Sequence, residues 1–419
     1  MDAVPAVPVT ISPEQARRLA IAKQHLSGPL PKRASKTGIL AAIRDLAYIQ
    51  WDPVNVVAPA HELTLWSRMG PFRRSHLEEL IWKDRQLFQG WGHAASLLPT
   101  EDYPIHYSLM RRYPECLSSG WGSWREWARK WLPAHRALRR TVLNELRDGP
   151  RTTREFAGHA KTRHSGNGWS SGSDVSAMLF HLWMRGEVMI VGHRGRENLW
   201  GLSESFLPDW VERRLLPRAD VESQFAQRAL RALGVASRRE INLSFPNGHY
   251  RELERQLTRL ERRGLIRRIR IAGVEGRDSR YIHHDDLEEL DSVTNGEWEP
   301  RVSLLSPFDN LIAVRSRLPA LFGFDFAHEN YVPREKRKFG VYVMPILGGD
   351  RFLGRIAPRM DRERRRLVME GVFAEPSAPT DRDTGRAVAE TIEHLAEFLG
   401  ADEVEYSKRV PDAWKSALR

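Results

Sequence analysis

The sequence predicts an α+β fold in which tandem winged-helix (helix-turn-helix) units are followed by a small β-rich domain. Two segments of the chain repeat the order of an apolar helical stripe, a glycine and two short β-prone runs. After Pro300 the pattern changes to short β-prone pieces separated by turns. The length of 419 residues exceeds one compact core of ordinary size, so two to four packed domains are expected.

The first clear copy of the repeat begins at Asp174. Apolar residues recur at helical spacing over 175–182, a stop follows at Gly186, and β-prone runs occupy 188–191 and 198–202. A glycine supplies the left-handed residue with which helices commonly end. Helix, glycine and hairpin is the order of a winged helix.

The second copy has an apolar stripe over 253–260, a stop at Gly264, a strand over 265–271 and a last strand that ends at Tyr281. Two candidate helices precede each copy. These helices are expected at 134–146 and 152–159, and at 224–233 and 237–243.

A third, degenerate copy is expected at the start of the chain. Helical patterns occupy 13–26 and 36–46, a β-prone run covers 48–57, and 63–66 reads as its partner strand. We therefore expect four domains. They are winged-helix units at 1–125 (carrying the motif described below), 126–215 and 216–300, and a β-barrel-like domain with a closing helix at 301–419.

The last of these domains is predicted from its short β-prone runs and two closing elements. The runs are 311–314, 339–345, 352–356 and 366–372, and they are followed by a helix over 384–399 and a strand over 404–406.

The chain is basic, with 65 Lys and Arg against 54 Asp and Glu and a net charge of +11. This balance favours a polyanionic partner such as double-stranded DNA. The single cysteine, Cys116, excludes an internal disulfide and a cysteine-based metal site and fits a reducing interior. No secretion signal and no run of 18 apolar residues occurs, so a soluble cytoplasmic protein without a membrane partner is expected.

Arginine is concentrated in two windows. Residues 259–280 carry eight arginines against three acids, and 351–366 carry seven against two. A solvated arginine-rich face would give the same pattern, but arginine on a wing favours contact with phosphate or the minor groove. The candidate DNA-binding arginines on the two clear wings are Arg194, Arg196, Arg267, Arg268, Arg270 and Arg277.

Common cofactor and metal motifs are missing from the sequence. His283 and His284 precede two aspartates, but adjacent side chains point apart and do not converge on a metal. Neither a phosphate-binding loop nor a nucleophile elbow occurs, which disfavours ATPases and α/β-hydrolases. We expect no cofactor and no metal.

The run LAYIQWD, residues 46–52, alternates polar and apolar side chains. In a strand, Gln50 and Asp52 would project from one face while Ile49 and Trp51 occupy the other. An ordinary edge strand also turns polar residues outward, so the alternation alone favours exposure over a functional site.

Three blocks decide between these interpretations. They are IQWDPVNVVAPAHELTLWSR, LFQGWGHAASLLPTEDY, and LLSPFDNLIAVRSRLPALFGFDF with ENYVPREKRKFGVYVMPIL. Together they resemble the bacterial crosslink-repair DNA glycosylases, relatives of the azinomycin-resistance glycosylases. The resemblance implies three tandem winged-helix units with a β-barrel, and it places the Gln-apolar-Asp form of the family signature on Gln50, Trp51 and Asp52.

The resemblance implies that Gln50 and Asp52 are catalytic in a monofunctional glycosylase. Such an enzyme would hydrolyse the N-glycosidic bond of N7-alkylated guanine, including interstrand crosslinks, and act as a monomer on duplex DNA. His61 and His93 are the next candidates, as lesion or phosphate contacts, although a buried histidine held by backbone carbonyls is the alternative for each.

The chain departs from the family pattern at Gln89, Gly90 and Glu62, which bears on the substrate range. The competing function is a non-enzymatic winged-helix DNA-binding protein, either a transcription regulator or a lesion-shielding factor. In that case Gln50 and Asp52 would be structural.

Overall fold

The computed structural model describes residues 9–52, 54–117, 119–159, 173–246, 248–274, 279–329 and 332–418, and it shows a mixed α+β fold. Arg277 lies outside the described residues. Three times along the chain a helix, a short strand, two further helical segments and a β-hairpin follow one another. In each case the short strand pairs with the second strand of the hairpin, which gives the same small antiparallel sheet.

The first of these units carries the Gln-Trp-Asp motif at the end of its short strand. Its sheet has the order β2-β4-β3, so β2 lies at one edge. Ser35 caps α2, and Ala47 at its end takes a left-handed conformation (φ 65°) that turns the chain into β2. The elements are α2 (Lys36–Leu46), β2 (Ile49–Gln50), α3 (Ala60–Met69), α4 (Arg74–Glu78), the π-helical η1 (Glu79–Lys83), β3 (Leu87–Trp91) and β4 (Ala95–Pro99).

The prediction of a strand over 63–66 was wrong, because these residues lie within α3. Nine of the ten residues of α3 are buried, all except Glu62. A helix enclosed on all sides has no polar face, so the 3.6-residue period that identifies surface helices is missing from its sequence.

The second unit contains a helix that is enclosed in the same way. All the residues of α8 except Ser176 are buried, and this helix packs against β3 of the first unit. The elements are α5 (Tyr103–Met110), α6 (Gly122–Ala134), α7 (Arg136–Arg147), β5 (Arg151–Thr152), the 3₁₀ segment η4 (Thr153–His159), α8 (Asp174–Met184), β6 (Val188–Arg194), β7 (Glu197–Leu202) and α9 (Ser203–Phe206).

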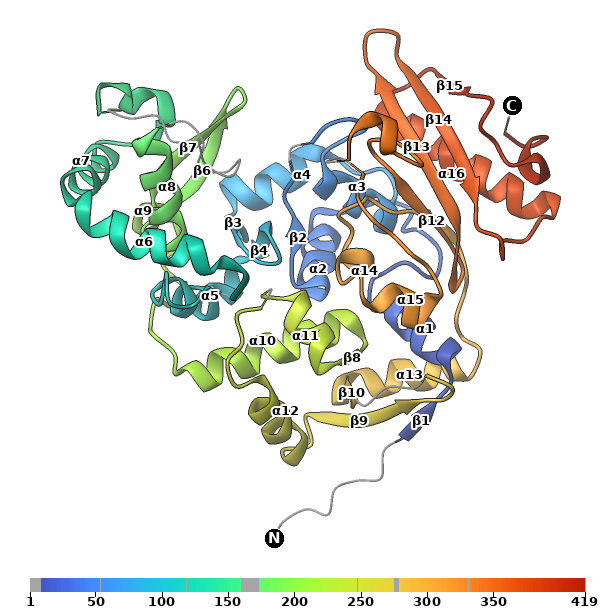
Figure 1. The fold of residues 1–419 in the computed structure, drawn as a ribbon, viewed down its shortest axis with the longest axis horizontal. Coiled ribbons are helices and arrows are strands. Elements are labelled where there is room, and N and C mark those ends of the chain that lie inside the picture. The colour runs from blue at the N-terminus through green and yellow to red at the C-terminus, as the bar shows by residue number, and fades with distance from the viewer. Residues whose placement is uncertain are drawn as a thin grey trace.

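The third unit is completed by the start of the chain. Strand β1 (Val9–Ile11) pairs in parallel with β9, and the helix that follows it, α1 (Pro13–Ala22), packs against β8 and α13. Figure 1 shows β1 and β9 side by side at the lower edge of the molecule. The elements are α10 (Arg218–Leu233), β8 (Val235–Ser237), α11 (Arg238–Ser244), α12 (Leu253–Arg262), β9 (Ile266–Ile271), β10 (Arg280–His283) and α13 (Leu287–Thr294).

The C-terminal part is a five-stranded sheet of order β11-β12-β13-β14-β15, in which only β15 runs parallel to its neighbour. Helix α16 packs along this sheet (Figure 1). Its elements are β11 (Val302–Leu304), α14 (Asn310–Ala313), α15 (Arg317–Phe322), β12 (Met344–Gly348), β13 (Arg351–Asp361), β14 (Arg366–Ala374), α16 (Arg382–Leu399) and β15 (Glu403–Tyr406).

Two expectations for this part are not confirmed. In the part of the chain that the structure describes, β11 and β15 do not pair, so the sheet is open and the predicted closed barrel is not observed. Residues 311–313 of the predicted run 311–314 lie in the short helix α14, which Asp309 caps by accepting a hydrogen bond from the Leu311 N–H. Short 3₁₀ turns complete the chain: η2 (Thr100–Asp102), η3 (Ser119–Trp121), η5 (His284–Asp286), η6 (Arg334–Lys336) and η7 (Asp412–Trp414).

Candidate functional site

The motif strand β2 separates its side chains as the alternation predicts. Ile49 pairs with Leu97 of β4 and is buried in the core, and Trp51 packs against the same core. Gln50 pairs with Ser96 and points to the other face, where it is half-buried. The backbone N–H of Trp51 still donates to the Ala95 carbonyl at 2.8 Å, so β4 holds the chain in place up to Asp52.

Asp52 is a half-buried carboxylate without a cationic partner among the described residues. Its Oδ1 accepts a hydrogen bond from the Val54 N–H at 2.9 Å. Burial raises the pKa of Asp52, and the bond from Val54 opposes part of that rise. Tyr342, from the segment before β12, is close enough for the charge of Asp52 to add to the rise in the phenol pKa that burial causes.

Asn310 of the C-terminal part holds the turn that precedes the motif. Its amide donates to the Tyr48 carbonyl at 2.8 Å and to the Leu46 carbonyl at 3.5 Å. Asn310 is itself fixed at the start of α14 beside Asp309, which forms a fully buried ion pair with Arg68 of α3. The placement of β2 therefore depends on residues more than 200 positions further along the chain.

Trp51 lies in an aromatic stack that joins the first and second units. The His61 ring lies parallel to it with 4.0 Å between ring centroids, and the His193 ring from β6 is also parallel at 5.9 Å. Trp82 of η1 meets His193 edge-on. The end of the β6–β7 hairpin therefore contacts the motif.

His61 is buried and His93 is half-buried. His61 is 6% exposed, and burial together with the neighbouring His193 lowers its pKa to about 3, so it is neutral at pH 7. His93 Nδ1–H donates to the Ser244 carbonyl at 2.9 Å, and burial lowers the pKa of this ring too. Tyr48 stacks on His93. This geometry favours packing roles, and the expected DNA contacts of these histidines stay predictions.

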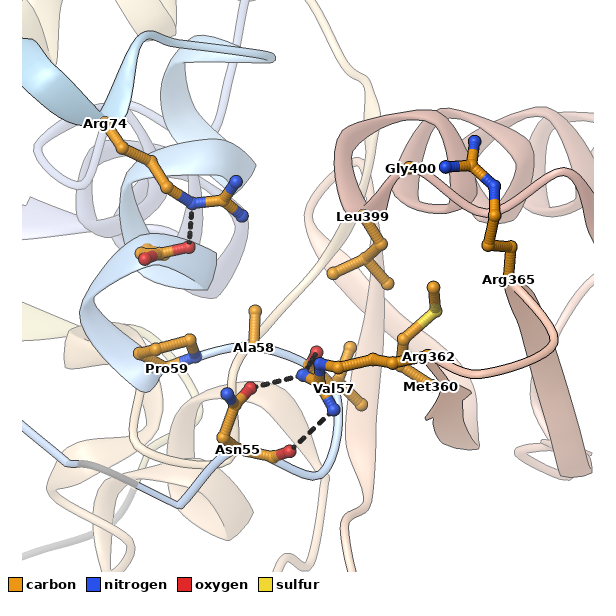
Figure 2. A pocket seen from close by; sticks show the side chains of 11 residues that line it. Asn55, Val57, Ala58, Pro59, Arg74, Met360, Arg362, Arg365, Leu399 and Gly400 are labelled. Atoms are coloured by element: carbon orange, nitrogen blue, oxygen red, sulfur yellow. Dashed lines mark hydrogen bonds and ion pairs between the residues drawn. The ribbon is translucent and has the colours of Figure 1, made fainter. Parts of the chain in front are cut away.

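The loop after the motif borders a polar hollow of about 400 Å³. Arg362, from the turn between β13 and β14, donates to the Asn55 side chain and to the Asn55 and Val57 carbonyls. Figure 2 shows this arginine reaching between Asn55 and Val57, with Arg74 and Arg365 at the sides of the hollow. Arg74 pairs with Glu62 and Arg365 with Asp402. Three arginines thus line a hollow that borders the loop after the motif.

The model of the family described as "DNA glycosylase AlkZ-like" matches residues 43–398, which is most of the chain. The chain belongs to this family. It is therefore a DNA glycosylase, and family membership decides against the non-enzymatic DNA-binding protein. The solved structure of Streptomyces sahachiroi DNA glycosylase AlkZ superposes with a TM-score of 0.67 at 16% identity, over 96% of this chain and 100% of that one. At this identity the likeness shows a shared fold.

In this AlkZ-like chain, two of the expected DNA-binding arginines lie near the motif. Arg194 and Arg196 stand at the β6–β7 turn next to His193, and both are exposed. Arg194 pairs with Glu155, which leaves Arg196 as the less constrained cation.

The arginines of β9 lie elsewhere. Figure 1 shows β9 at the lower edge of the molecule, with α10 and α11 between it and β2. Arg268 pairs with Glu261 and lies over the Tyr281 ring, Arg267 is half-buried, and Arg270 is exposed. The structure does not bring these three together with Gln50 and Asp52.

Tyr342 and Asn310 beside the motif, and Arg362 and Arg74 beside the loop that follows it, were not predicted from the sequence. The arginine-rich window 351–366 was a signal for Arg362, but nothing local shows which of its arginines reaches the motif. Within the described ranges, no group of three His, Cys, Asp or Glu side chains is arranged to hold a metal. No helix in those ranges has the length and apolar character needed to span a membrane.

Proposed function

We propose that this glycosylase hydrolyses the bond between deoxyribose and N7-alkylated guanine, with Asp52 as the catalytic carboxylate and Gln50 as the water-positioning residue. The observation that carries the proposal is a half-buried carboxylate directly after the edge strand β2. Asp52 has a raised pKa and lacks a cationic partner among the described residues, and Gln50, two residues earlier, is also half-buried.

The chemistry suits an amide and a carboxylate. Alkylation at N7 makes the base cationic, so it departs with the electron pair of the C1′–N9 bond without prior protonation. A carboxylate stabilises the oxocarbenium-like sugar that remains. The oxygen of a water then bonds to C1′, and its proton passes to Asp52. The amide of Gln50 can both donate to and accept from that water. The proposal assigns no lysine nucleophile, so the product is an abasic site.

Interstrand crosslinks are included in the proposed substrate range. A guanine joined to the opposite strand cannot swing freely into a closed pocket. The half-buried rather than enclosed positions of Gln50 and Asp52 support access to a base that stays in the duplex. Arg74 and Arg365, at the sides of the adjacent hollow, are exposed and suited to bind phosphate oxygens of the DNA strand.

We further propose that the three repeated units are winged helices that bind duplex DNA as parts of one monomer, with units at 1–125, 126–215 and 216–300 and the C-terminal domain at 301–419. The repeated order and pairing of their strands support this assignment. In a winged helix the third helix commonly contacts DNA, and α8 holds that position in the second unit. Because it is buried, the second unit would contact DNA through its hairpin instead of its third helix.

The test uses duplexes that contain one N7-methylguanine or one nitrogen-mustard crosslink. Wild type, Gln50→Ala and Asp52→Asn are incubated with each duplex, and alkali then converts abasic sites into strand breaks. We expect breaks with wild type, and a loss of about 100-fold or more in the single-turnover rate for Asp52→Asn. Asp412→Asn, whose carboxylate is 99% exposed, is the control and should behave as wild type.

Two results would contradict the proposal. If Asp52→Asn releases base at the rate of Asp412→Asn, Asp52 is not catalytic. If borohydride traps a covalent enzyme–DNA adduct, the reaction uses an amine nucleophile instead of water.

A further inference from the structure

A second concentration of arginine lies on α7, in the second unit. Five arginines line a groove of about 700 Å³ along this helix, which we call the α7 groove. Four of them, Arg136, Arg139, Arg140 and Arg147, belong to α7, and Arg185 follows the end of α8.

The sequence of α7 places three of these arginines in one row. Arg136, Arg140, Leu143 and Arg147 follow the spacing i, i+4, i+7, i+11, which keeps side chains on one face of a helix. At 1.5 Å per residue the row is about 16 Å long. On the other side of the helix, Val142 and Leu146 are buried. The helix is therefore amphipathic with an arginine-rich outer face.

Acidic side chains neutralise only part of the groove. Glu187 accepts from both Arg139 and Arg185. Arg136 and Arg140 are exposed and have no acidic partner among the described residues. Arg147 also lines a neighbouring hollow together with Arg111 and Arg213, where two carboxylates, Glu187 and Glu204, accompany the arginines. A row of guanidinium groups with free donors matches the regularly spaced phosphates of a nucleic-acid backbone.

The α7 groove lies apart from the candidate active site. Helix α7 packs on α8 and β7, and α8 in turn packs on β3. Because α8 is buried between them, α7 faces away from the sheet that carries Gln50 (Figure 1).

We propose that the α7 groove binds the phosphodiester backbone of DNA outside the stretch that reaches Gln50 and Asp52. It would grip DNA that flanks the lesion and so add affinity for long duplexes without taking part in base release. The inference rests on duplex DNA as the substrate, and it does not depend on the catalytic roles assigned above.

The test compares Arg136→Ala/Arg140→Ala with wild type and with Arg382→Ala/Arg386→Ala. The control pair has the same residue type and the same i, i+4 spacing on the exposed face of α16. Binding is measured by fluorescence anisotropy over a salt series, with duplexes of about 10 and about 40 base pairs, or about one and four helical turns. Each duplex carries a central N7-methylguanine. Thermal unfolding checks that all variants fold.

On the long duplex, the α7 variant should lose about 1.8 units of the slope of log K against log salt, the amount expected for two phosphate contacts. When the salt is raised from 50 to 200 mM, the affinity of the α7 variant should therefore fall by a factor that is roughly 12-fold smaller than the factor for wild type. On the short duplex it should bind as wild type does. The single-turnover rate of base release at saturating enzyme should be unchanged, and this rate on the short duplex tests the proposed function separately.

Several results would overturn the inference. Unchanged affinity and slope on the long duplex would remove it directly. Equal losses on both duplexes would make the groove part of the main binding site, and an equal loss in the α16 variant would reduce the effect to general charge. If the α7 variant loses binding of a poly-glutamate peptide while its long-duplex affinity stays at the wild-type level, the groove is a protein-docking surface.

Discussion

Asp52 has a protonation equilibrium that its surroundings shift toward the neutral acid. The folded protein raises its pKa, so the carboxylate that the proposed reaction needs forms at a higher pH than in an ordinary aspartate. The single-turnover rate should therefore fall as pH drops through this raised pKa. A pH series on N7-methylguanine duplex should show this acidic limb in wild type. A rate that stays flat over the range in which Asp52 titrates would contradict the assignment.

The same shift has a consequence for stability. A carboxyl whose folded-state pKa lies above its unfolded value binds its proton more tightly when folded, so its charge lowers stability as pH rises through the folded pKa. Asp52→Asn removes that charge. The variant should therefore be at least as stable as wild type at pH 7 while losing activity, which urea unfolding can check. A clear loss of stability would mean that the Asp52 carboxylate has a structural role.

Trp51 stabilises the contact between the first and second units through its stack with His61 and His193. Trp51→Ala removes a large ring from this stack and should cost about 3 kcal/mol in the free energy of unfolding. Trp51→Phe keeps a stacking ring and should recover most of that loss. Equal stability of the two variants in urea would show that the stack contributes little.

At the scale of elements, Arg68 of α3 and Asp309 before α14 form a fully buried pair with contacts of 2.6 and 2.9 Å. Asp309→Asn can keep the cap of α14 but leaves the Arg68 charge without its partner. We expect a loss of about 3–5 kcal/mol in the free energy of unfolding. Adding Arg68→Met should restore part of the stability, since no unpaired charge then remains buried. No recovery in the double variant would mean that the pair acts through packing.

The β13–β14 hairpin fixes the loop that follows Asp52, chiefly through Arg362. Arg362→Ala should lower the single-turnover rate roughly 10- to 100-fold, because a small displacement of a catalytic group has effects of that size. Arg364→Ala, at the exposed tip of the same turn, is the matched control and should keep the rate at saturating enzyme. Equal rates for the two variants would show that the loop does not need this contact.

At the scale of the whole molecule, the start of the chain supports the third unit. Ile11 of β1 is buried in the same core as Ile269 and Ile271 of β9. Ile11→Asp should therefore weaken the pairing of β1 with β9, although the two strands are about 260 residues apart in the sequence. Hydrogen exchange at the amides of β9 should become faster. Thr10→Asp, on the exposed side of the same strand, should leave that exchange unchanged. Similar exchange in both variants would exclude this dependence.

The sequence alone predicted those helices and strands whose apolar period and end residues can be seen within the element itself. Helix α12 has one apolar face and ends before Gly264, so its period and its stop are both visible. Helices α3 and α14 were missed for physical reasons: the first is enclosed on nearly all sides, and the second is a single turn set by one cap. Closure of the C-terminal sheet depends on which edges meet, and no local pattern determines that.

The candidate site also combines a feature that the local sequence predicts with contacts that it does not predict. Alternation along 46–52 is a local signal, and it is enough to predict that Gln50 projects from the face opposite Ile49 and Trp51. The partners of the motif, Asn310, Tyr342 and Arg362, come from segments more than 250 residues later, and only the folded chain brings them to it. The resemblance to a known family suggested the candidate site, and tertiary packing supplies the contacts that hold its backbone in place.

The pairing of Val9 with Ile269 also sets an order of events during synthesis. The first strand leaves the ribosome long before the strand that it joins. At about 5–20 residues per second, the 260 residues between the two take roughly 13–52 s to make. During that interval β1 has no strand to pair with, and the third unit cannot complete its sheet. The third unit therefore cannot fold as a continuous segment of the nascent chain, because β1 stays unpaired until β9 has left the ribosome.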